Sequence, residues 1–422
     1  MAEVKPLRTL RYDLRAVGSL DAVIAPPYDV IDPQRRAALV ERSPFNVVEI
    51  DLPEPHDGPE DPYAHAATVM EAWRQQSVLV REREPALWAL AQDFTAPDGS
   101  RRTRTGFFAR VRVKDYGAGR IRPHERTQPG PKEDRLRLTR ATRANLSPIF
   151  SLFDDPGGEA QAALEAAVGD EPFAAATDDD GVENRLWRIA DPAALEAVER
   201  ALAPRELLIA DGHHRYETAR IYAQEVGGEG EHRYVLMFLC ALSDPGLAVF
   251  PTHRLLTDLG DPALQERLGA ALKRDFEIER VERSAVEPPS DANAVAFGYM
   301  DAHFRQPFRL RLRDPQVAAA ALPERSEAYR SLDTAVLEAL VLREALGMSE
   351  GDIAAQRGVT YAKSTDAALE AVESGAADAA FFMRATPIEQ VQAVAAAGES
   401  MPPKSTFFYP KVPTGLVFSP LE

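Results

Sequence analysis

The feature that most constrains this chain is a short polar turn between a buried strand and a helix. Asp211-Gly212-His213-His214-Arg215 follows the apolar run 207–210, which predicts a buried strand. In residues 216–226 apolar side chains recur at i, i+3, i+4 and i+7, which predicts a helix that ends at Gly227-Gly228. Because a helix N-terminus offers backbone N–H groups and the positive end of the helix dipole, the turn predicts a site for a phosphate or a carboxylate.

The side chains of this turn suit an anion. His213, His214 and Arg215 carry N–H donors that can hold or neutralise a negative group, and Gly212 lets the backbone turn. Asp211 has two possible roles, orienting His214 or holding Mg²⁺ through water. The alternative is an ordinary solvated connection. A zinc site is a weaker interpretation, since the single cysteine lies in an apolar run and no His-x3-His spacing occurs.

Length and composition bound the class of protein. The chain has 422 residues, 45% of them hydrophobic, which is enough for two or three globular domains. One cysteine excludes an internal disulfide and fits a reducing cytoplasm. The charged N-terminus lacks the apolar core of a signal peptide, and no apolar run approaches the roughly 20 residues that span a bilayer. We therefore expect a cytoplasmic protein with no membrane partner.

Charge is distributed unevenly along the chain. The formal net charge of −17 opposes binding to nucleic acid, whereas residues 101–143 contain 12 Arg and 2 Lys against 2 Asp and 2 Glu. Few aromatic residues interleave this basic stretch, so it does not predict a single-stranded nucleic-acid platform. A pocket for a small phosphorylated ligand fits better, although most of these arginines are also consistent with a solvated surface balanced by acidic neighbours.

Local patterns predict the following elements. A helix begins at Asp32-Pro33, residues 46–52 alternate like a strand, 63–81 form an amphipathic helix, 87–94 and 103–113 form paired strands, and 132–143 form a basic helix. From about residue 256 the chain is predicted to be mainly helical with scattered strands. Thr386-Pro387-Ile388-Glu389 is predicted to be a capping box that starts a helix ending at Gly398.

Other polar residues beside turns and strand ends are candidates for binding a substrate. The proline pair of Pro26-Pro27-Tyr28-Asp29 fixes the backbone that presents Tyr28 and Asp29, although a purely structural turn explains it equally well. The predicted substrate-binding residues are Tyr28, Asp29, Arg143, Asn145, Ser147, His253 and Arg254. The rigid loop Pro402-Pro403-Lys404-Ser405-Thr406 carries an amine and two hydroxyls, and its lysine is either a phosphate ligand or a solvated side chain.

Three separated segments, in this order, resemble the free serine kinases, which are cytoplasmic enzymes with a ParB/sulfiredoxin-like fold. Pro123-His124-Glu125 resembles the segment that carries the catalytic base, 211–215 resembles the phosphate-binding turn, and 386–406 resembles the C-terminal helix and phosphate-contacting loop. The resemblance implies catalytic roles for Glu125, His124, Asp211 and His214. It implies phosphate or nucleotide binding by Gly212, His213, His214, Arg215, Lys404, Ser405 and Thr406. A surface ion pair with Arg126 is the alternative for Glu125.

The chain also resembles a large bacterial family of unknown function. In that family Pro26-Pro27-Tyr28-Asp29, His124-Glu125, Asn145-Leu146-Ser147-Pro148 and the Asp-Gly-His-His-Arg turn recur together. This second resemblance covers nearly the whole length and carries no activity. The kinase resemblance covers only its three segments, and this chain departs from the kinases in its extra N-terminal region and in the 87 positions between His124 and Asp211.

Together these patterns predict an α/β protein, α+β in detail, with an N-terminal α/β region (1–84), a core (85–255) and a helix-rich C-terminal α/β domain (256–422). The kinase resemblance implies that the core is ParB-like and catalytic and that the last loop returns to the active site. The predicted activity is transfer of a phosphoryl group from ADP, ATP or pyrophosphate, with Mg²⁺, to the hydroxyl of free serine or a similar amino acid. The alternatives are a phosphatase acting on phosphoserine and a non-catalytic nucleotide-binding switch of the kind that binds CTP. No nucleic-acid partner is expected.

Overall fold

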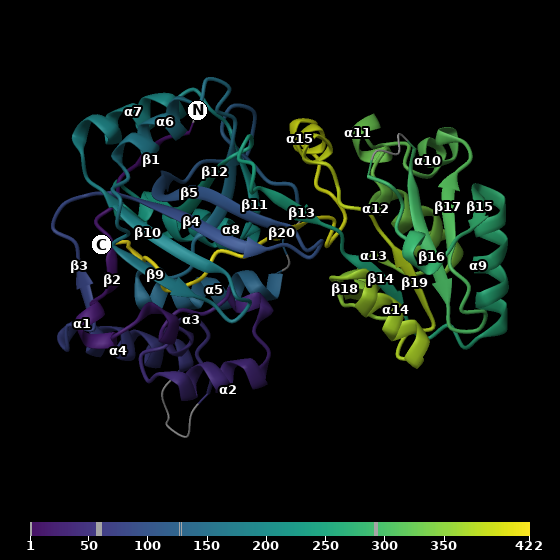
Figure 1. Cartoon of the computed structure of the whole chain (residues 1–422), viewed down its shortest axis with the longest axis horizontal. Helices are drawn as coiled ribbons and strands as arrows, with labels where there is room; N and C mark the ends of the chain where they lie inside the picture. Colours follow the sequence, from purple (N-terminus) through teal and green to yellow (C-terminus); the bar gives the residue numbers. More distant parts are fainter. Residues whose placement is uncertain (1, 56–60, 126, 128, 291–293) are drawn as a thin grey trace. The chain divides into compact units, whose positions relative to one another are not determined.

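The computed structural model describes residues 2–55, 61–125, 127, 129–290 and 294–422. The described chain divides into two compact units, shown in Figure 1. The first unit contains Met1–Pro123, Thr127–Leu247 and Pro410–Glu422, and the second contains His124–Arg126 and Ala248–Tyr409. Each unit combines helices with a β-sheet, so the predicted mixed α/β class is confirmed.

The first unit is built on a mixed sheet. Its strand order is β6 (Ile121–Arg122), β11 (Leu207–Asp211), β8 (Ile149–Phe153), β12 (Tyr234–Ala241), β5 (Arg101–Arg112), β4 (Leu87–Thr95), β10 (Glu183–Ile189) and β9 (Ala174–Thr177), with β1 (Val4–Lys5) also on β5. The predicted β4–β5 hairpin is present. β11 runs parallel to β6 and β12 runs parallel to β8, whereas the other described neighbours in this sheet are antiparallel.

Helices complete the core of the first unit. α5 (Pro129–Thr142) packs against α8 (His213–Val226), and α6 (Glu159–Ala167) packs against α7 (Pro192–Leu202). The strands and helices share one hydrophobic cluster whose members include Phe107, Phe153, Ile209, Tyr216 and Leu239, each at most 2% exposed. Burying each such side chain contributes about 1.5–3 kcal/mol, which fixes the strand that leads into the 211–215 turn.

The N-terminal region contains α1 (Leu14–Val17), α2 (Pro33–Arg42), α3 (Val48–Asp51), α4 (Pro62–Gln75), β2 (Leu10–Tyr12) and β3 (Leu79–Arg81). The prediction of a strand at 46–52 is wrong, because residues 48–51 form α3 and the buried Asn46 side chain accepts from the Val48 N–H just before it. The predicted helix at 63–81 ends at Gln75, since the chain turns at Ser77 with φ of 59° and then pairs as β3 with β2.

The end of the chain belongs to the first unit. In Figure 1 the yellow C-terminal segment runs through that unit, where β21 (Ser419–Pro420) pairs with β7 (Ala144–Asn145). Backbone bridges also join Phe418 to Leu10 and Thr414 to Ala25. Residues 1–84 are therefore in the same compact unit as the sheet, and the division into three domains stays a prediction.

The second unit has its own antiparallel sheet. The strand order is β15 (Phe276–Arg280), β17 (Phe308–Leu312), β16 (Ala296–Asp301), β19 (Ala379–Phe382), β14 (His253–Leu256) and β18 (Val359–Ala362). Its helices are α9 (Pro262–Asp275), α10 (Pro315–Ala321), α11 (Glu327–Arg330), α12 (Asp333–Val336), which continues as a π-helical segment (Leu337–Ala345), α13 (Glu350–Ala354), α14 (Thr365–Ser374) and α15 (Ile388–Ala396). The strands that looked scattered in the sequence therefore form one sheet.

The start of α15 differs from the predicted capping box. Pro387 occupies the N-cap position, and the Thr386 hydroxyl donates instead to the Ser405 carbonyl oxygen at 2.7 Å. This bond ties the start of α15 to the loop that precedes β20 (Phe407–Tyr409), which pairs with β13 (Ala248–Phe250). None of the helices in the described ranges is long and apolar enough to cross a membrane.

Candidate functional site

The Asp211–Arg215 turn lies at the junction of β11 and α8, as the sequence predicts. The pairing of β11 with β8 shifts register between Ile209 and Asp211, and such irregularities re-aim side chains at strand ends. Gly212 is the N-cap of α8 and has φ of 95°. This backbone conformation favours glycine, and a Cβ there would lie 2.9 Å from Nε of Arg215, so a larger residue would displace the guanidinium.

Asp211 holds two cations in place. One of its carboxylate oxygens accepts from Nη2 of Arg215 at 2.7 Å, and the other accepts from Nζ of Lys411 at 2.5 Å. Burial alone would raise the pKa of the Asp211 carboxyl, but Lys411 and Arg215 outweigh burial and hold that pKa well below its ordinary value. Asp211 is therefore ionised at neutral pH, and it orients Arg215 and Lys411.

Lys411 is the functional candidate that the sequence analysis missed. Burial lowers the pKa of its ammonium, but the carboxylates of Asp211 and Asp29 outweigh burial and raise that pKa above its ordinary value. The lysine is 200 positions from its partner Asp211, so no local pattern joins them. The available signal was its place between Pro410 and Pro413, which restrict the backbone on either side.

Arg215 joins the turn to the segment before β8. Its Nη1 donates to Oγ of Ser147 at 2.8 Å and also to the carbonyl oxygen of Pro148. The Thr414 hydroxyl, in the C-terminal segment, donates in turn to Ser147 at 2.9 Å. The structure therefore brings Ser147 to the turn, where its hydroxyl helps to fix the orientation of Arg215, and its predicted contact with substrate stays a prediction.

The predicted Tyr28-Asp29 turn belongs to the same charged neighbourhood. The Arg135 guanidinium lies over the Tyr28 ring, 4.2 Å from its centroid. Burial raises the pKa of the Tyr28 hydroxyl to about 12, against the opposing charges of Arg215 and Arg135. Asp29 is exposed and acts electrostatically on Lys411. A role in selecting a substrate stays a prediction for both residues.

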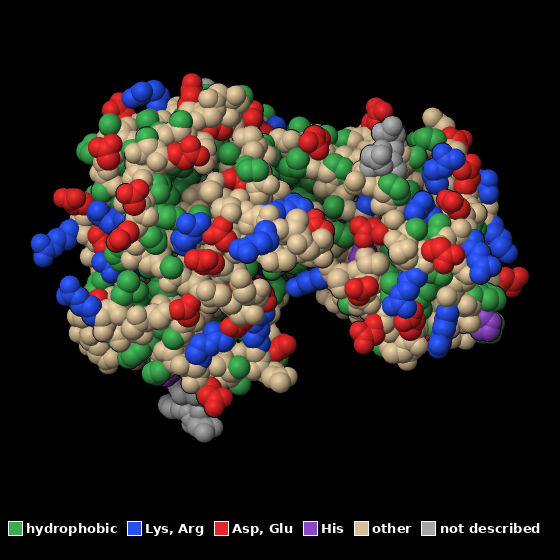
Figure 2. Space-filling model, viewed as in Figure 1, with side chains coloured by type: hydrophobic (Ala, Val, Ile, Leu, Met, Phe, Trp, Pro, Cys, Tyr) green, Lys and Arg blue, Asp and Glu red, His purple; other side chains and the backbone are tan. Residues whose placement is uncertain are grey.

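Most arginines of the basic stretch are balanced by acidic neighbours. Ion pairs join Arg102 to Asp98, Arg110 to Glu231, Arg112 to Glu229, Arg122 to Glu206, Arg137 to Asp61, Arg140 to Glu225 and Arg143 to Glu422. Figure 2 shows blue and red side chains interspersed on the visible face of the first unit. These ion pairs match the alternative of a balanced, solvated surface, and Arg143 lies on that surface.

Arg104 and Arg135 depart from this pattern because they are buried. Arg104 is fully buried, lies 4.5 Å from the Phe150 ring centroid and donates to the Gln92 carboxamide oxygen. Burial lowers the pKa of Arg104 to about 10. The Gln92 carboxamide nitrogen donates to the Lys411 carbonyl oxygen at 3.3 Å, so a buried polar network supports the backbone that carries the Lys411 ammonium.

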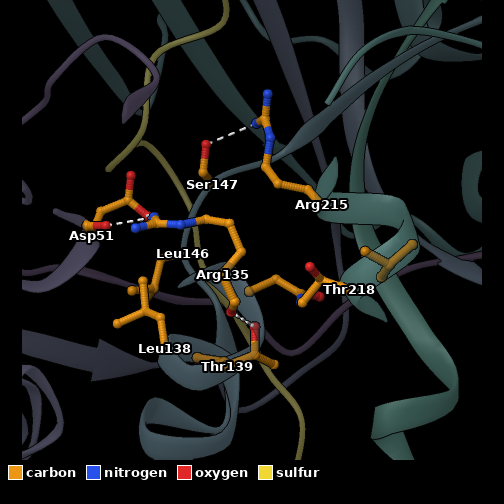
Figure 3. A pocket seen from close by; sticks show the side chains of 11 residues that line it. Asp51, Arg135, Leu138, Thr139, Leu146, Ser147, Arg215 and Thr218 are labelled. Carbon is orange, nitrogen blue, oxygen red and sulfur yellow. Dashed lines mark hydrogen bonds and ion pairs between the residues drawn. The ribbon is translucent and has the colours of Figure 1, made fainter. Parts of the chain in front are cut away.

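A small cavity lies beside Arg215, and Figure 3 shows it closely. Its lining comes from α3, α5, α8, β12 and the segment before β8: Asp51, Arg135, Leu138, Thr139, Ala144, Asn145, Leu146, Ser147, Arg215, Thr218 and Val235. The predicted residues Asn145 and Ser147 thus line the same cavity as Arg215. Asn145 also accepts the Leu236 N–H at 3.0 Å through its carboxamide oxygen, which fixes the orientation of that side chain.

The second unit holds the other part of the predicted site. His124 is buried and its Nε2 contacts the Thr406 hydroxyl at 2.9 Å, while the Met401 N–H donates to the His124 carbonyl oxygen at 2.7 Å. Glu125, which is partly buried, forms an isolated backbone bridge with Met401. The structure therefore brings the His124-Glu125 segment and the 402–406 loop together within one unit.

The loop 402–406 is held by its own unit. Arg254, which is buried, donates to the carbonyl oxygens of Pro403 and Lys404 at 3.0 and 3.1 Å. Lys404 itself is exposed and has φ of 57°, whereas Ser405 is buried and contacts the Thr334 hydroxyl at 2.9 Å. That the loop completes the site at Asp211 stays a prediction.

His253 and Arg254 have internal partners that account for their polar groups. The fully buried His253 accepts the Met383 N–H on Nδ1 at 3.0 Å and contacts the Thr365 hydroxyl through Nε2 at 3.2 Å. Arg254 holds the loop through its Nη2 and also donates to the Thr252 carbonyl oxygen at 2.5 Å. These contacts give both residues structural roles, and their contact with substrate stays a prediction.

The residues at the turn do not fit a protein-bound magnesium ion. Asp211 is already engaged by Lys411 and Arg215. Within the described ranges of the chain, no three or more His, Cys, Asp or Glu residues gather where they could hold a metal. Mg²⁺ carried by the phosphates of a nucleotide needs few protein ligands, and a requirement for Mg²⁺ stays a prediction.

The fold and site define a mixed α/β protein in which a strand-to-helix turn presents oriented cations. The chain belongs to the family described as "Protein of unknown function (DUF1015)", whose model matches residues 4–335. The suspected membership in a large family of unknown function is thereby confirmed. No match was found among curated proteins.

Solved structures that resemble the chain include free serine kinases. A conserved hypothetical protein from Pyrococcus furiosus is 18% identical, with 70% of this chain and 92% of that chain covered and a TM-score of 0.36. A free serine kinase in complex with AMP is 16% identical, with 70% and 88% covered and a TM-score of 0.36. SbnI from Staphylococcus aureus, truncated at its C-terminus, is 11% identical, with 73% and 85% covered and a TM-score of 0.37. These values carry no activity over to this chain, and the ParB/sulfiredoxin-like core stays a prediction.

Proposed function

We propose that this protein is a phosphotransferase that moves a phosphoryl group from a nucleotide or pyrophosphate to the hydroxyl of a small amino acid, with free serine as the first candidate. The observation that carries the proposal is the pair of cations, Arg215 and Lys411, that Asp211 orients at the N-terminus of α8. The order of the three kinase-like segments in the sequence supports it.

Oriented cations suit phosphoryl transfer because this reaction needs charge stabilisation rather than covalent chemistry from the protein. Donors fixed in advance stabilise the charge on the transferring phosphoryl oxygens without reorganising during the reaction. Arg215 is fixed by Asp211 and Ser147, and Lys411 is fixed by Asp211. In the proposed function the backbone N–H groups at the start of α8 bind the phosphate, and His213 and His214 add ring donors.

The acceptor hydroxyl needs a base, and we assign this role to Glu125. A carboxylate that takes the hydroxyl proton makes the oxygen a better nucleophile for the phosphorus. His124 and Thr406, joined by their 2.9 Å contact, support the segment that carries Glu125. Lys404 is assigned to the phosphate donor. The proposal places the reaction in the cytoplasm, because the single cysteine, Cys240, is free and buried.

The test is direct observation of the reaction. The protein is incubated with L-serine and, separately, with ADP, ATP, pyrophosphate or CTP in the presence of Mg²⁺, and the products are followed by phosphorus NMR. A new phosphoserine signal with one of the donors is the expected result. Hydrolysis of added phosphoserine without transfer would favour the phosphatase, whereas nucleotide binding without any turnover would favour a binding switch.

The assignment of Glu125 has its own prediction. Glu125→Gln keeps the shape of the side chain but cannot accept a proton at neutral pH, so turnover should fall by about 10²–10⁴-fold while nucleotide affinity is retained. The matched control is Glu389→Gln, which changes another carboxylate of the second unit, in the first turn of α15. Turnover of Glu125→Gln close to that of the unaltered protein would remove Glu125 from the mechanism.

A further inference from the structure

The cavity beside Arg215 contains a buried cationic group that the proposed phosphate site does not use. The cavity volume is about 40 Å³. At roughly 11 Å³ for each water-sized sphere, it has room for about three water molecules or one carboxylate group. Arg215 lies on its wall and also contacts Asp211, so the cavity adjoins the 211–215 turn within the first unit.

Arg135, on α5, is the buried cationic group on the wall of this cavity. The residue is 5% exposed; its Nε donates to the Asp134 carboxylate at 2.7 Å, and its Nη1 donates to the Asp51 carbonyl oxygen at 2.6 Å. Its Nη2 is buried and has no hydrogen-bond partner in the described part of the chain. Buried donors are nearly always paired, and a cationic donor without a partner is especially unfavourable. Because Arg135 lines the cavity, an acceptor that enters the cavity is the candidate partner for this nitrogen.

The surroundings restrict the charge of that acceptor. Asp51 lines the cavity, and Asp134 contacts the same guanidinium. A doubly charged phosphoryl group would be repelled by the two carboxylates more strongly than a singly charged carboxylate would, and a carboxylate needs no more than the one donor that Arg135 has left. Asn145 and Thr218 add neutral polar groups to the lining.

We propose that this cavity is a subsite for the carboxylate group of a small amino acid, with Nη2 of Arg135 as its donor. The proposal deepens the proposed function and rests on it. It puts the carboxylate of the acceptor amino acid beside Arg215, a residue of the proposed phosphate site. It adds Arg135 and Asp51 to the residues that select the acceptor.

The test compares an acid with its matched amide. Binding of L-serine and of L-serinamide to the full-length protein is measured by isothermal titration calorimetry without nucleotide. The expected result is at least tenfold tighter binding of L-serine, which carries the carboxylate. Arg135→Lys keeps the charge but loses the guanidinium edge, and it should abolish this preference. The control Arg137→Lys, on the same helix but exposed and paired with Asp61, should retain the preference.

A second variant, Asp51→Asn, separates a role of Asp51 in binding from a purely structural role. Asp51→Asn removes a carboxylate from the cavity wall, so L-serine should bind several-fold more tightly, whereas loss of a purely structural ion pair would lower the melting temperature without raising affinity. If Arg135→Lys does not fold, as judged by circular dichroism, Asp51→Asn decides the question.

Three outcomes would overturn the proposal. They are equal binding of acid and amide, retention of the preference in Arg135→Lys, and displacement of L-serine by inorganic phosphate at lower concentration than by acetate. The first indicates a cavity that holds only water, and the last indicates a phosphoryl group as its occupant. Because binding is measured without turnover, absence of kinase activity with intact acid binding refutes the proposed function alone.

Discussion

Several titratable side chains of this protein are buried, and burial together with neighbouring charges shifts their pKa values. Asp211 is kept ionised by Arg215 and Lys411, whereas burial lowers the pKa of the fully buried Arg104 to about 10. His253 shows the same principle without a carboxylate partner, since burial and then the neighbouring Arg254 lower its pKa to about 4. At this scale, therefore, burial and neighbouring charges set how far the pKa of each residue departs from its ordinary value.

The lowered pKa of His253 predicts a pH dependence of stability. At pH 5 the unfolded chain, with an ordinary pKa of 6.5, binds a proton that the folded protein does not, so stability is present at pH 7.5 and is lost as pH falls below 6.5 toward 4. The expected loss between pH 7.5 and 5 is about 2 kcal/mol. Urea unfolding at both values measures it.

His253→Gln should flatten this part of the pH dependence while lowering stability at pH 7.5, because the Met383 N–H loses its acceptor geometry. The exposed His303, replaced by Asn, is the control and should leave the slope unchanged. A slope that is the same in His253→Gln and in the unaltered protein would show that His253 does not titrate in this way.

Among the elements, the junction of β11 and α8 is where sequence and structure agree most closely. The predicted strand, the turn at Gly212, the helix and its end at Gly227 are all present in the structure. Each of them depends on residues that are close together in the sequence. The 46–52 segment and the capping box at 386–389 failed for the opposite reason. In both, a buried hydrogen bond replaced the expected local pattern: the Asn46 side chain accepts from the Val48 N–H, and the Thr386 hydroxyl donates to the Ser405 carbonyl oxygen.

Gly212→Ala tests the turn as an element. An alanine at φ of 95° is strained, and its Cβ would displace the Arg215 guanidinium, so ADP affinity should fall about tenfold or more and stability by about 1–2 kcal/mol. Gly18→Ala is the matched control, since Gly18 also has positive φ but has open space around its added Cβ. It should lose similar stability and no ADP affinity. Equal ADP affinity in the two variants would exclude the turn from nucleotide binding.

The 402–406 loop and β20 give a paired prediction at the same scale. Lys404→Ala should weaken binding of the phosphate donor by about 1.5–3 kcal/mol, the scale of a charge-assisted hydrogen bond, and leave the melting temperature unchanged because the side chain is exposed. Phe408→Ala, at a 2% exposed position, should instead lower stability by about 3–5 kcal/mol. Donor affinity that does not change in Lys404→Ala would refute a role for this loop in the site.

At the scale of the whole molecule, the C-terminal segment, Pro410–Glu422, connects parts of the first unit that are far apart in the sequence. Within the first unit it carries Lys411 to the turn, and it bonds to the N-terminal region through Phe418 and Thr414, both fully buried. Residues that begin and end the sequence are thus neighbours in one unit. This arrangement makes the last residues part of both the core and the candidate site.

Truncation after Tyr409 tests this role. Removal of the buried Phe418 and Thr414, and with them the backbone bridges to Leu10 and Ala25, should increase hydrogen exchange throughout the first unit and lower its melting temperature. Exchange within the sheet of the second unit should change little, since that sheet has its own hydrophobic core. Removal of Glu422 alone is the control. Exchange in the first unit that matches this control would mean that the segment is not part of its core.

What the sequence by itself determined is local: the strand, turn and helix around Asp211, the β4–β5 hairpin, the helix begun by Asp32-Pro33, and the mixed α/β class. Hydrophobic periodicity, helix caps and positive φ each depend on a few neighbouring residues, so these features can be recognised from the sequence alone. Only the tertiary structure decided that Lys411 meets Asp211 across 200 positions, that Arg135 meets Asp51 across 84, and that strands far apart in the second unit form one sheet. Such contacts depend on which surfaces are buried together, a property of the packed chain that no single segment contains.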